Sequence, residues 1–365
     1  MERLPEDVVL EILSRLPVTT LVLSKSVCRS WRCIIQSSLL INKHLLHMAE
    51  NDPCIIFQIH RPIQDHYYFV DFACYGEGNR SLKKISVSTI HARLVASVNG
   101  LLCFCNYSVI HICNPLTRDF VELPMLSRCY GELGILGFGF SPMTREYKVV
   151  EIVYRRKRFR FESYLAASYP FQSQVRILTL GGSQWRSLGM IPYQFIRPQS
   201  QVTVNGRLHW ISHHGNIIVN NRIISFDLTT EQFQEIPPPD NVTLDRRVFE
   251  LVVLRDHLCA AVSNISCGLD IWVMKEYNVK ESWVKEFMIE GYLPVEFHSM
   301  NGRIPFFRSE FRAVCRLRSG KILLERRCKN FVLYDPVHGT FEDFVFERAL
   351  NRFKMIAHVG SLVSI

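Results

Sequence analysis

The sequence lacks the features of a membrane-spanning or secreted protein. No run of about 18 apolar residues occurs in the chain, so no segment is predicted to cross a bilayer as a helix. The first residues, MERLPEDVV, contain no basic segment followed by an apolar one, which is the pattern of a secretory signal. We therefore expect a cytoplasmic or nuclear protein without a membrane partner.

Motifs of common enzyme classes are also missing. The chain contains no GxSxG nucleophile elbow, no HExxH metal-binding pair and no GxxxxGK phosphate loop. The glycines of GELGILGFGF, residues 131–140, are spaced differently from a dinucleotide-binding loop, and a strand rather than a helix is predicted to follow them. We predict a protein that is not an enzyme and needs no cofactor. A β-propeller enzyme whose catalytic residues converge only on folding is the alternative.

Cysteines are numerous, but they do not form a recognisable metal motif. None of the 12 cysteines belongs to a CxxC pair, and the densest group is Cys103, Cys105, His111 and Cys113. Alternating pairs on neighbouring strands could hold zinc tetrahedrally, although this spacing differs from that of common zinc sites. Reduced cysteine packs as a small hydrophobe, so we interpret these residues as part of a core and predict no metal.

The first 48 residues show the pattern of short helices. In LPEDVVLEILSRLP, residues 4–17, apolar residues recur with the 3.6-residue period between Pro5, which suits a first turn, and Pro17, which cannot continue the helix. Further helices are predicted after residue 19, after residue 26 and over residues 38–48. A module this small is near the limit for a self-sufficient core, so we expect part of its apolar surface to bind a partner.

From residue 54 onward, short apolar runs alternate with turn residues, and a weak repeat is visible. Four turns align, NPLTRDF at 114, SPMTREY at 141, DLTTEQF at 227 and DPVHGTF at 335, each opened by a residue that can hydrogen-bond its own backbone. The aromatic six residues later is expected to begin a strand and enter the core. Turn dipeptides followed by strands recur in NGLLCF, NGRLHW and SGKILL.

Repeated antiparallel units of this kind favour a β-propeller. The predicted fold class is α+β: a small N-terminal module of three to four helices, residues 1–48, followed by a large all-β domain, residues 54–365. Its length allows about six blades, and a large β-sandwich is the alternative.

These motifs resemble those of plant F-box proteins of the F-box-associated type. The F-box resemblance lies in the Leu-Pro start, the Ile-Leu-x-x-Leu-Pro middle and the Val-Cys-x-x-Trp end of residues 4–35. The β part resembles the F-box-associated domain through NGLLCF with NPLTRDF, GFGFSP, NGRLHW, FDLTTEQFQEIP and the closing GSLVSI. LVLSKSV departs from the more basic stretch usual in the family.

The resemblance implies a substrate-recognition subunit of a Skp–cullin–F-box ubiquitin ligase. Its F-box would dock on a Skp-type adaptor, and its β domain would capture a protein substrate for ubiquitination and degradation. An F-box scaffold that acts without ubiquitin transfer is a further alternative. Carried over by motif, the adaptor contacts are Leu4, Pro5, Val8, Ile12, Leu13, Leu16, Pro17, Leu21, Val27 and Trp31.

The most basic segment is VYRRKRFRFESY. The chain carries 43 basic and 34 acidic residues, a net charge of +9, and this segment interleaves five basic residues with aromatics. A solvated loop is the simplest interpretation, and contact with an acidic or phosphorylated substrate is the alternative that we retain. Nucleic acid is not expected as a partner. The candidate substrate-binding residues are Tyr154, Arg155, Arg156, Lys157, Arg158, Arg160 and Tyr164.

Overall fold

The structure is a computed structural model of the 365-residue chain. It describes residues 4–59, 66–70, 83–85, 92–106, 109–124, 132–155, 173–195, 201–213, 222–240, 242, 249–264, 268–290, 311–326, 330–344 and 353–365. The chain divides into two compact units, a first unit of residues 1–125 with 351–365 and a second unit of residues 126–350. Among the described residues, no helix combines the length and apolar character that a bilayer crossing requires.

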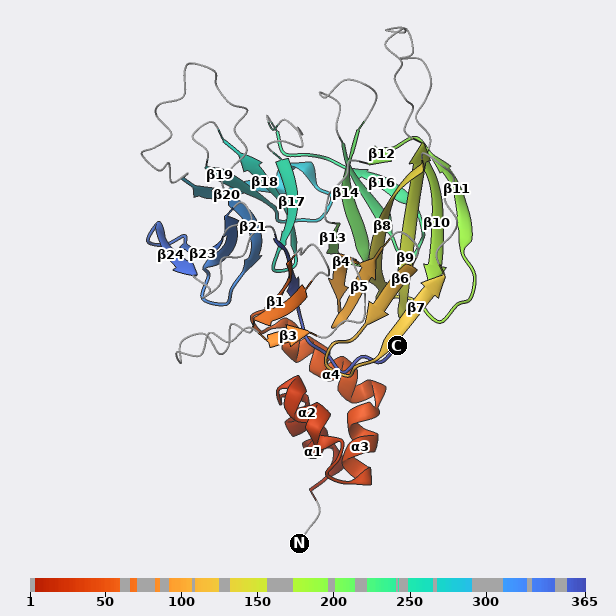
Figure 1. The fold of residues 1–365 in the computed structure, drawn as a ribbon. Coiled ribbons are helices and arrows are strands. Elements are labelled where there is room, and N and C mark those ends of the chain that lie inside the picture. Colours follow the sequence, from red (N-terminus) through yellow and green to blue (C-terminus); the bar gives the residue numbers. More distant parts are fainter. Residues whose placement is uncertain are drawn as a thin grey trace. The chain divides into compact units, whose positions relative to one another are not determined.

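The first unit begins with four helices, as the periodicity predicts (Figure 1). They are α1 (Glu6–Ser14), α2 (Val18–Ser24), α3 (Arg29–Gln36) and α4 (Ser38–Ala49). Pro5 and Pro17 determine where α1 and α2 begin, because each proline occupies the N-cap position of its helix with an extended backbone. The side chains of Cys28 and Ser37 accept backbone hydrogen bonds from the first turns of α3 and α4.

Two antiparallel sheets complete the first unit. One has the strand order β25 (Phe353–His358), β1 (Cys54–Ile59), β2 (His66–Val70) and β3 (Lys83–Ile85). The other has the order β4 (Arg93–Val98), β5 (Leu101–Cys105), β6 (Val109–Cys113) and β7 (Phe120–Pro124). The pairing of β25 with β1 places Cys54 opposite His358, so strands from the two ends of the β region share one sheet.

The second unit contains four further antiparallel sheets. The first sheet contains β8 (Glu132–Ser141), β9 (Glu146–Arg155), β10 (Ser173–Thr179) and β11 (Arg186–Ile191). The second sheet contains β14 (Arg207–His213), β15 (Arg222–Asp227) and β16 (Phe233–Ile236), and both β12 (Gln194–Phe195) and β13 (Val202–Val204) pair with β14. The third sheet contains β17 (Phe249–Leu254), β18 (His257–Ser263), β19 (Leu269–Met274) and β20 (Trp283–Ile289). The fourth sheet contains β21 (Phe311–Arg316), β22 (Ile322–Arg326), β23 (Asn330–Asp335) and β24 (Thr340–Phe344). A 3₁₀ turn, η4 (Lys280–Ser282), precedes β20.

The described strands therefore make six meandering sheets, which are the blades of a β-propeller. The predicted fold class, a small N-terminal helical module followed by a β-propeller of about six blades, is confirmed, and the described strands do not form the alternative β-sandwich. Apolar residues on the middle strands of each sheet fill the core; in the sheet of β17–β20 these include Cys259 and Ile271.

The repeated turns have the geometry that their sequences predict. Asn99-Gly100 and Asn205-Gly206 have positive φ at both residues, so each forms the tight hairpin that asparagine and glycine favour. In the four longer turns, the residue four positions after the opening one has positive φ: Arg118, Arg145, Glu231 and Gly339. The amide of each donates to the carbonyl of its opening residue.

One turn differs in position from the other three, and one prediction about the turns is wrong. The turn opened by Ser141 joins the first two strands of its sheet, whereas the other three turns join the third strand to the fourth. Phe120 and Phe341 begin outermost strands and remain exposed, so the prediction that they enter the core is wrong. An outermost strand has no neighbouring strand on one side, so a large side chain there is covered less completely.

Candidate adaptor-binding surface

The four helices enclose a small apolar core. Its fully buried members are Leu13, Leu21, Ile35, Leu40 and Leu362, the last of which follows β25. Two of these, Leu13 and Leu21, are among the predicted adaptor contacts. The structure corrects that prediction, because both side chains are enclosed within the module and offer no surface to a partner.

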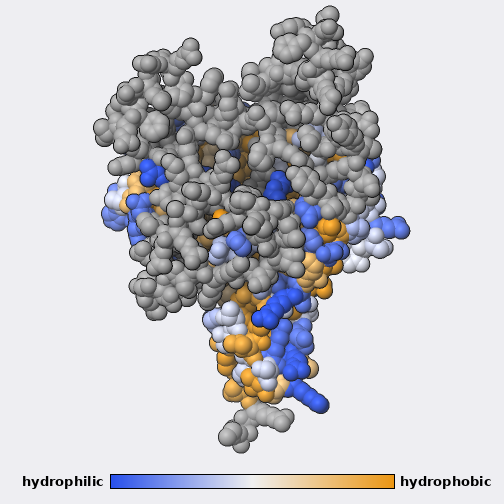
Figure 2. All heavy atoms as spheres, viewed as in Figure 1, coloured by the Kyte–Doolittle hydropathy of each residue, from blue (hydrophilic) through white to orange (hydrophobic). Residues whose placement is uncertain are grey.

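A stripe of apolar residues on and before α1 has no such cover. Leu4, Val8 and Ile12 are 61%, 42% and 49% exposed and follow one another at intervals of four residues. Val8 and Ile12 are one turn apart and so lie on one side of α1, and Leu4 directly precedes the N-cap residue of the helix. We call these three exposed residues the apolar stripe. Figure 2 shows hydrophobic side chains gathered over one part of the helices, with hydrophilic ones beside them.

Exposed apolar side chains also occur at the end of α2. Val27, a predicted adaptor contact, is exposed, and so is Leu23, which the sequence prediction did not include. Their spacing of four residues was the signal that could have identified Leu23. The predicted contacts Pro5 and Pro17 are also exposed.

Two predicted contacts occupy an intermediate position. Leu16 and Trp31 are partly buried and pack against the core of the four helices. Each therefore contributes to the fold of the module and also presents part of its surface outward. A substitution at either position would disturb both roles, which makes them poor tests of partner binding.

Polar contacts hold α1 against α4. Glu11 accepts a hydrogen bond from Arg15 Nε at 2.7 Å and pairs with Lys43 of α4; Lys43 and Arg15 together lower the pKa of Glu11 to about 2. The ring of His44 lies 3.1 Å from the Leu16 carbonyl through Nε2. Burial lowers the pKa of His44, so the neutral ring donates to the carbonyl of Leu16, which lies between α1 and α2.

The predicted substrate segment lies mostly outside the described residues. Strand β9 ends at Arg155, Tyr154 is buried in it, and residues 156–164 are not described. Arg156, Lys157, Arg158, Arg160 and Tyr164 therefore stay predictions, and of Arg155 only the backbone is described.

The cysteine group lies in neighbouring strands of one sheet. Cys103 of β5 and Cys113 of β6 are buried, and burial raises the pKa of both thiols, that of Cys113 to about 12. Such thiols remain protonated and pack as small hydrophobes. In the part of the chain that the structure describes, no group of three or more His, Cys, Asp or Glu side chains is arranged to hold a metal.

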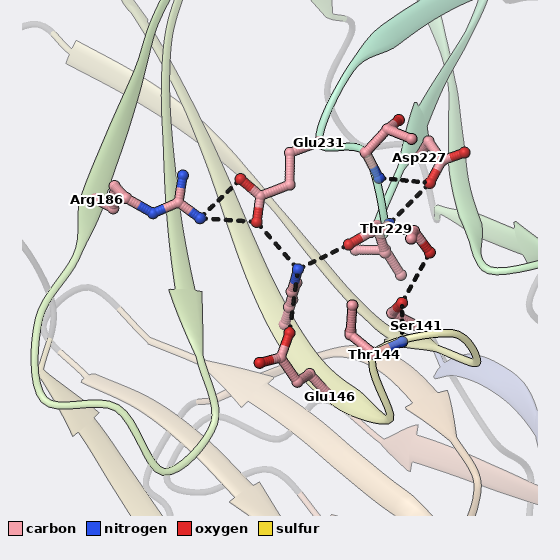
Figure 3. Close-up of polar contacts among 10 residues, drawn as sticks. Ser141, Thr144, Glu146, Arg186, Asp227, Thr229 and Glu231 are labelled. Carbon is pink, nitrogen blue, oxygen red and sulfur yellow. Dashed lines mark hydrogen bonds and ion pairs between the residues drawn. The ribbon is translucent and has the colours of Figure 1, made fainter.

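The second unit contains a charge network between two of its sheets (Figure 3). Lys148 of β9 is buried, and its ammonium donates to the Leu228 carbonyl at 2.8 Å and to Glu231 at 3.0 Å. Arg186 also pairs with Glu231 at 2.7 Å. Partial burial opposes ionisation, but the hydrogen bonds from Arg186 and Lys148 lower the pKa of Glu231 below its usual value. Because each charge in this network has a partner, we interpret it as a structural tie between blades.

Comparison with known families agrees with this architecture. Residues 1–43 match the F-box domain, and residues 45–353 match the F-box associated beta propeller domain. A helical module with an uncovered apolar stripe, followed by a propeller, is thus the architecture of an F-box protein. This chain belongs to the family of F-box proteins that carry an F-box-associated β-propeller domain.

Curated relatives extend over almost the whole chain. F-box protein At3g07870 of Arabidopsis thaliana is 35% identical over 395 residues, covering 99% of this chain and 92% of the relative. F-box protein CPR1 of the same plant is 24% identical over 349 residues, covering 88% of this chain and 82% of the relative. Among solved structures, oligogalacturonate lyase from Vibrio parahaemolyticus is 7% identical with a TM-score of 0.43, over 77% of this chain and 71% of that one. A likeness at that level supports no statement about activity.

Proposed function

We propose that this protein is the substrate-receptor subunit of a Skp–cullin–F-box ubiquitin ligase. The F-box docks on a Skp-type adaptor that belongs to a cullin–RING ligase, and the propeller holds a protein substrate for ubiquitination and degradation. The observation that carries the proposal is the apolar stripe, Leu4, Val8 and Ile12, which the described residues leave uncovered. Exposed apolar surface on a small helical module is typical of a protein interface.

The contribution of such a subunit is proximity rather than bond chemistry. Holding a substrate lysine near the ubiquitin-loaded enzyme raises its effective concentration without any catalytic group from the receptor. We infer a non-catalytic subunit without a cofactor. A cytoplasmic or nuclear location is consistent with this role and stays a prediction.

The adaptor contact can be tested by placing a charge in the apolar stripe. Ile12→Asp would bury a carboxylate without a partner in the interface, so we expect pull-down of a purified Skp-type adaptor to be lost. Leu46→Asp is the matched control, because Leu46 of α4 is 71% exposed and lies outside residues 1–43 that match the F-box domain. Adaptor binding by Ile12→Asp at the strength of the wild type would contradict the proposal.

We further propose that the basic segment after β9 contacts the substrate. Its support is the concentration of charge: Arg155, Arg156, Lys157, Arg158 and Arg160 interleave with aromatic residues. Replacing these five residues with Ser should reduce the proteins captured when proteasome activity is blocked, while adaptor binding is unchanged. Serine substitution of the exposed turn residues Arg118, Arg145 and Arg255 controls for loss of positive charge. Equal capture by wild type and the five-residue variant would assign the segment to solvent.

A further inference from the structure

The segment after β25 packs into the F-box. Leu362 is 2% exposed and belongs to the same apolar cluster as Leu13, Leu21, Ile35 and Leu40 of the helices. The core of the F-box is therefore not made by residues 4–49 alone.

The same segment is also held by the sheet of β4–β7. Asn114 is fully buried, and its side-chain amide donates to the carbonyls of Ser361 at 3.0 Å and Val363 at 2.8 Å. The Ser361 hydroxyl donates to the Asn99 carbonyl at 2.5 Å, and the amide of Val363 donates to that hydroxyl at 3.1 Å. A side chain at Gly100 would overlap Ser361, so the hairpin turn must have glycine here to admit the segment.

Asn114 can make these contacts because it has both hydrogen-bonding functions. Its carbonyl oxygen accepts from Leu116 and Thr117 amides, at 3.0 and 3.4 Å, and so closes its own turn. Its amide group is then directed to the segment after β25. In the equivalent turns, Asp227 and Asp335 also close their turns, but a carboxylate has no hydrogen to donate.

Strand pairing explains how the segment reaches the helices. The antiparallel register places His358, at the end of β25, opposite Cys54, at the start of β1. Helix α4 ends at Ala49, so only residues 50–53 separate it from β1. A chain that leaves β25 therefore emerges where the helices join the first sheet. Gly360 lies there, so close to Leu116 and Val18 of α2 that an added Cβ would be 2.8 and 3.3 Å from their side chains.

We propose that residues 360–363 act as a clasp that completes the F-box core through Leu362 and fixes the F-box to the sheet of β4–β7 through Asn114. The clasp is a positioning element: it makes the F-box and that sheet move as one body. Its importance for ubiquitin transfer rests on the proposed function, but the physical coupling does not.

The test is hydrogen exchange of the full chain, measured by mass spectrometry without any adaptor. Leu362→Ser should accelerate exchange in α1–α4 by roughly tenfold or more, because a buried leucine is removed from their core. Asn114→Asp keeps the oxygen that closes the turn but replaces the NH₂ group that donates to the carbonyls of Ser361 and Val363. We therefore expect hydrogen exchange at the Val363 amide to accelerate by about tenfold. Strands β17–β20 of the second unit serve as the internal reference in both variants.

Matched controls separate the clasp from general damage. Asp335→Asn makes the reverse change in an equivalent turn that is not part of the clasp. Ile365→Ser changes a partly exposed residue close to the clasp in the sequence. Neither substitution should alter hydrogen exchange in the helices. If Leu362→Ser leaves helix exchange within about twofold of wild type, or Asn114→Asp leaves Val363 equally protected, the clasp is refuted. Should Leu362→Ser fail to fold, Asn114→Asp alone decides.

The same proteins distinguish this proposal from the proposed function. If the wild type does not bind a Skp-type adaptor but exchange changes as expected, the clasp stands and the receptor role fails. If the adaptor binds and exchange does not change, only the clasp fails.

Discussion

Ile12 and Leu13 are adjacent in α1, both are apolar, and the structure assigns them opposite roles. Ile12 is 49% exposed in the apolar stripe, whereas Leu13 is 1% exposed in the helical core. We predict that alanine at each position produces a different phenotype. Ile12→Ala should weaken adaptor binding and leave stability nearly unchanged, and Leu13→Ala should lower the free energy of unfolding of the F-box.

The expected magnitudes follow from burial. Full burial of an isoleucine side chain stabilises by about 1.5–3 kcal/mol, so covering the exposed half of Ile12 contributes about 1 kcal/mol. Its removal should raise the adaptor Kd by roughly fivefold. Removing most of a buried leucine creates a cavity, and Leu13→Ala should lower the unfolding free energy by about 2–5 kcal/mol.

Isothermal titration calorimetry with a purified adaptor gives the Kd, and urea unfolding gives the stability. Because four of the five tryptophans lie in the second unit, hydrogen exchange of α1–α4 across the urea series, rather than tryptophan fluorescence, reports the stability of the F-box. The assignment of the two faces is wrong if Ile12→Ala destabilises as much as Leu13→Ala while adaptor affinity is unchanged. It is equally wrong if Leu13→Ala has no effect on stability.

Two other predictions concern buried ionisable groups. Glu231→Ala leaves the Lys148 ammonium buried with fewer partners and releases Arg186, so urea unfolding of the second unit should show a loss of about 2–4 kcal/mol; an unchanged midpoint would contradict the tie between blades. Burial lowers the pKa of His358 from 6.5 to about 4, so the unfolded chain binds its proton first as the pH falls. Stability should therefore decrease between pH 6.5 and about pH 4 by up to about 3 kcal/mol, and His358→Gln should reduce this slope, which a pH series of unfolding curves would measure.

Local sequence signals predicted the elements that depend on local chemistry. Pro5 starts α1 near the predicted position because proline restricts its own backbone wherever it stands. Pro17 was predicted only to end the first helix; it is also the N-cap residue of α2, which begins at Val18 rather than after residue 19. The turns opened by Asn114 and Asp227 form because their side chains bond amides two and three residues later. The repetition of such turns favoured the propeller over the β-sandwich that the sequence left as an alternative.

The faces of the helices could not be predicted in this way. A period of 3.6 residues identifies an apolar side, but Val8, Ile12 and Leu13 all satisfy it within the width of that side. Which of them is covered depends on the other helices and on Leu362, which is distant in the sequence. The sequence motif GSLVSI supported the resemblance to the family, but nothing local to it indicated a place inside the F-box core.

The repeated turns show how one backbone shape can serve different purposes. In the turns opened by Asn114, Asp227 and Asp335, the side chain closes its turn with one oxygen, and its second polar group is then available for another contact. In Asp227 that group pairs with Arg207 at 2.8 Å, and in Asp335 it lies 3.0 Å from His338 Nδ1, so in both turns the second carboxylate oxygen contacts a side-chain nitrogen. In Asn114 the second group is a donor, and it holds two backbone carbonyls instead. Exchanging an oxygen for an NH₂ group changes only what the turn can bind, which is why asparagine occurs at the turn where another segment of the chain must be held.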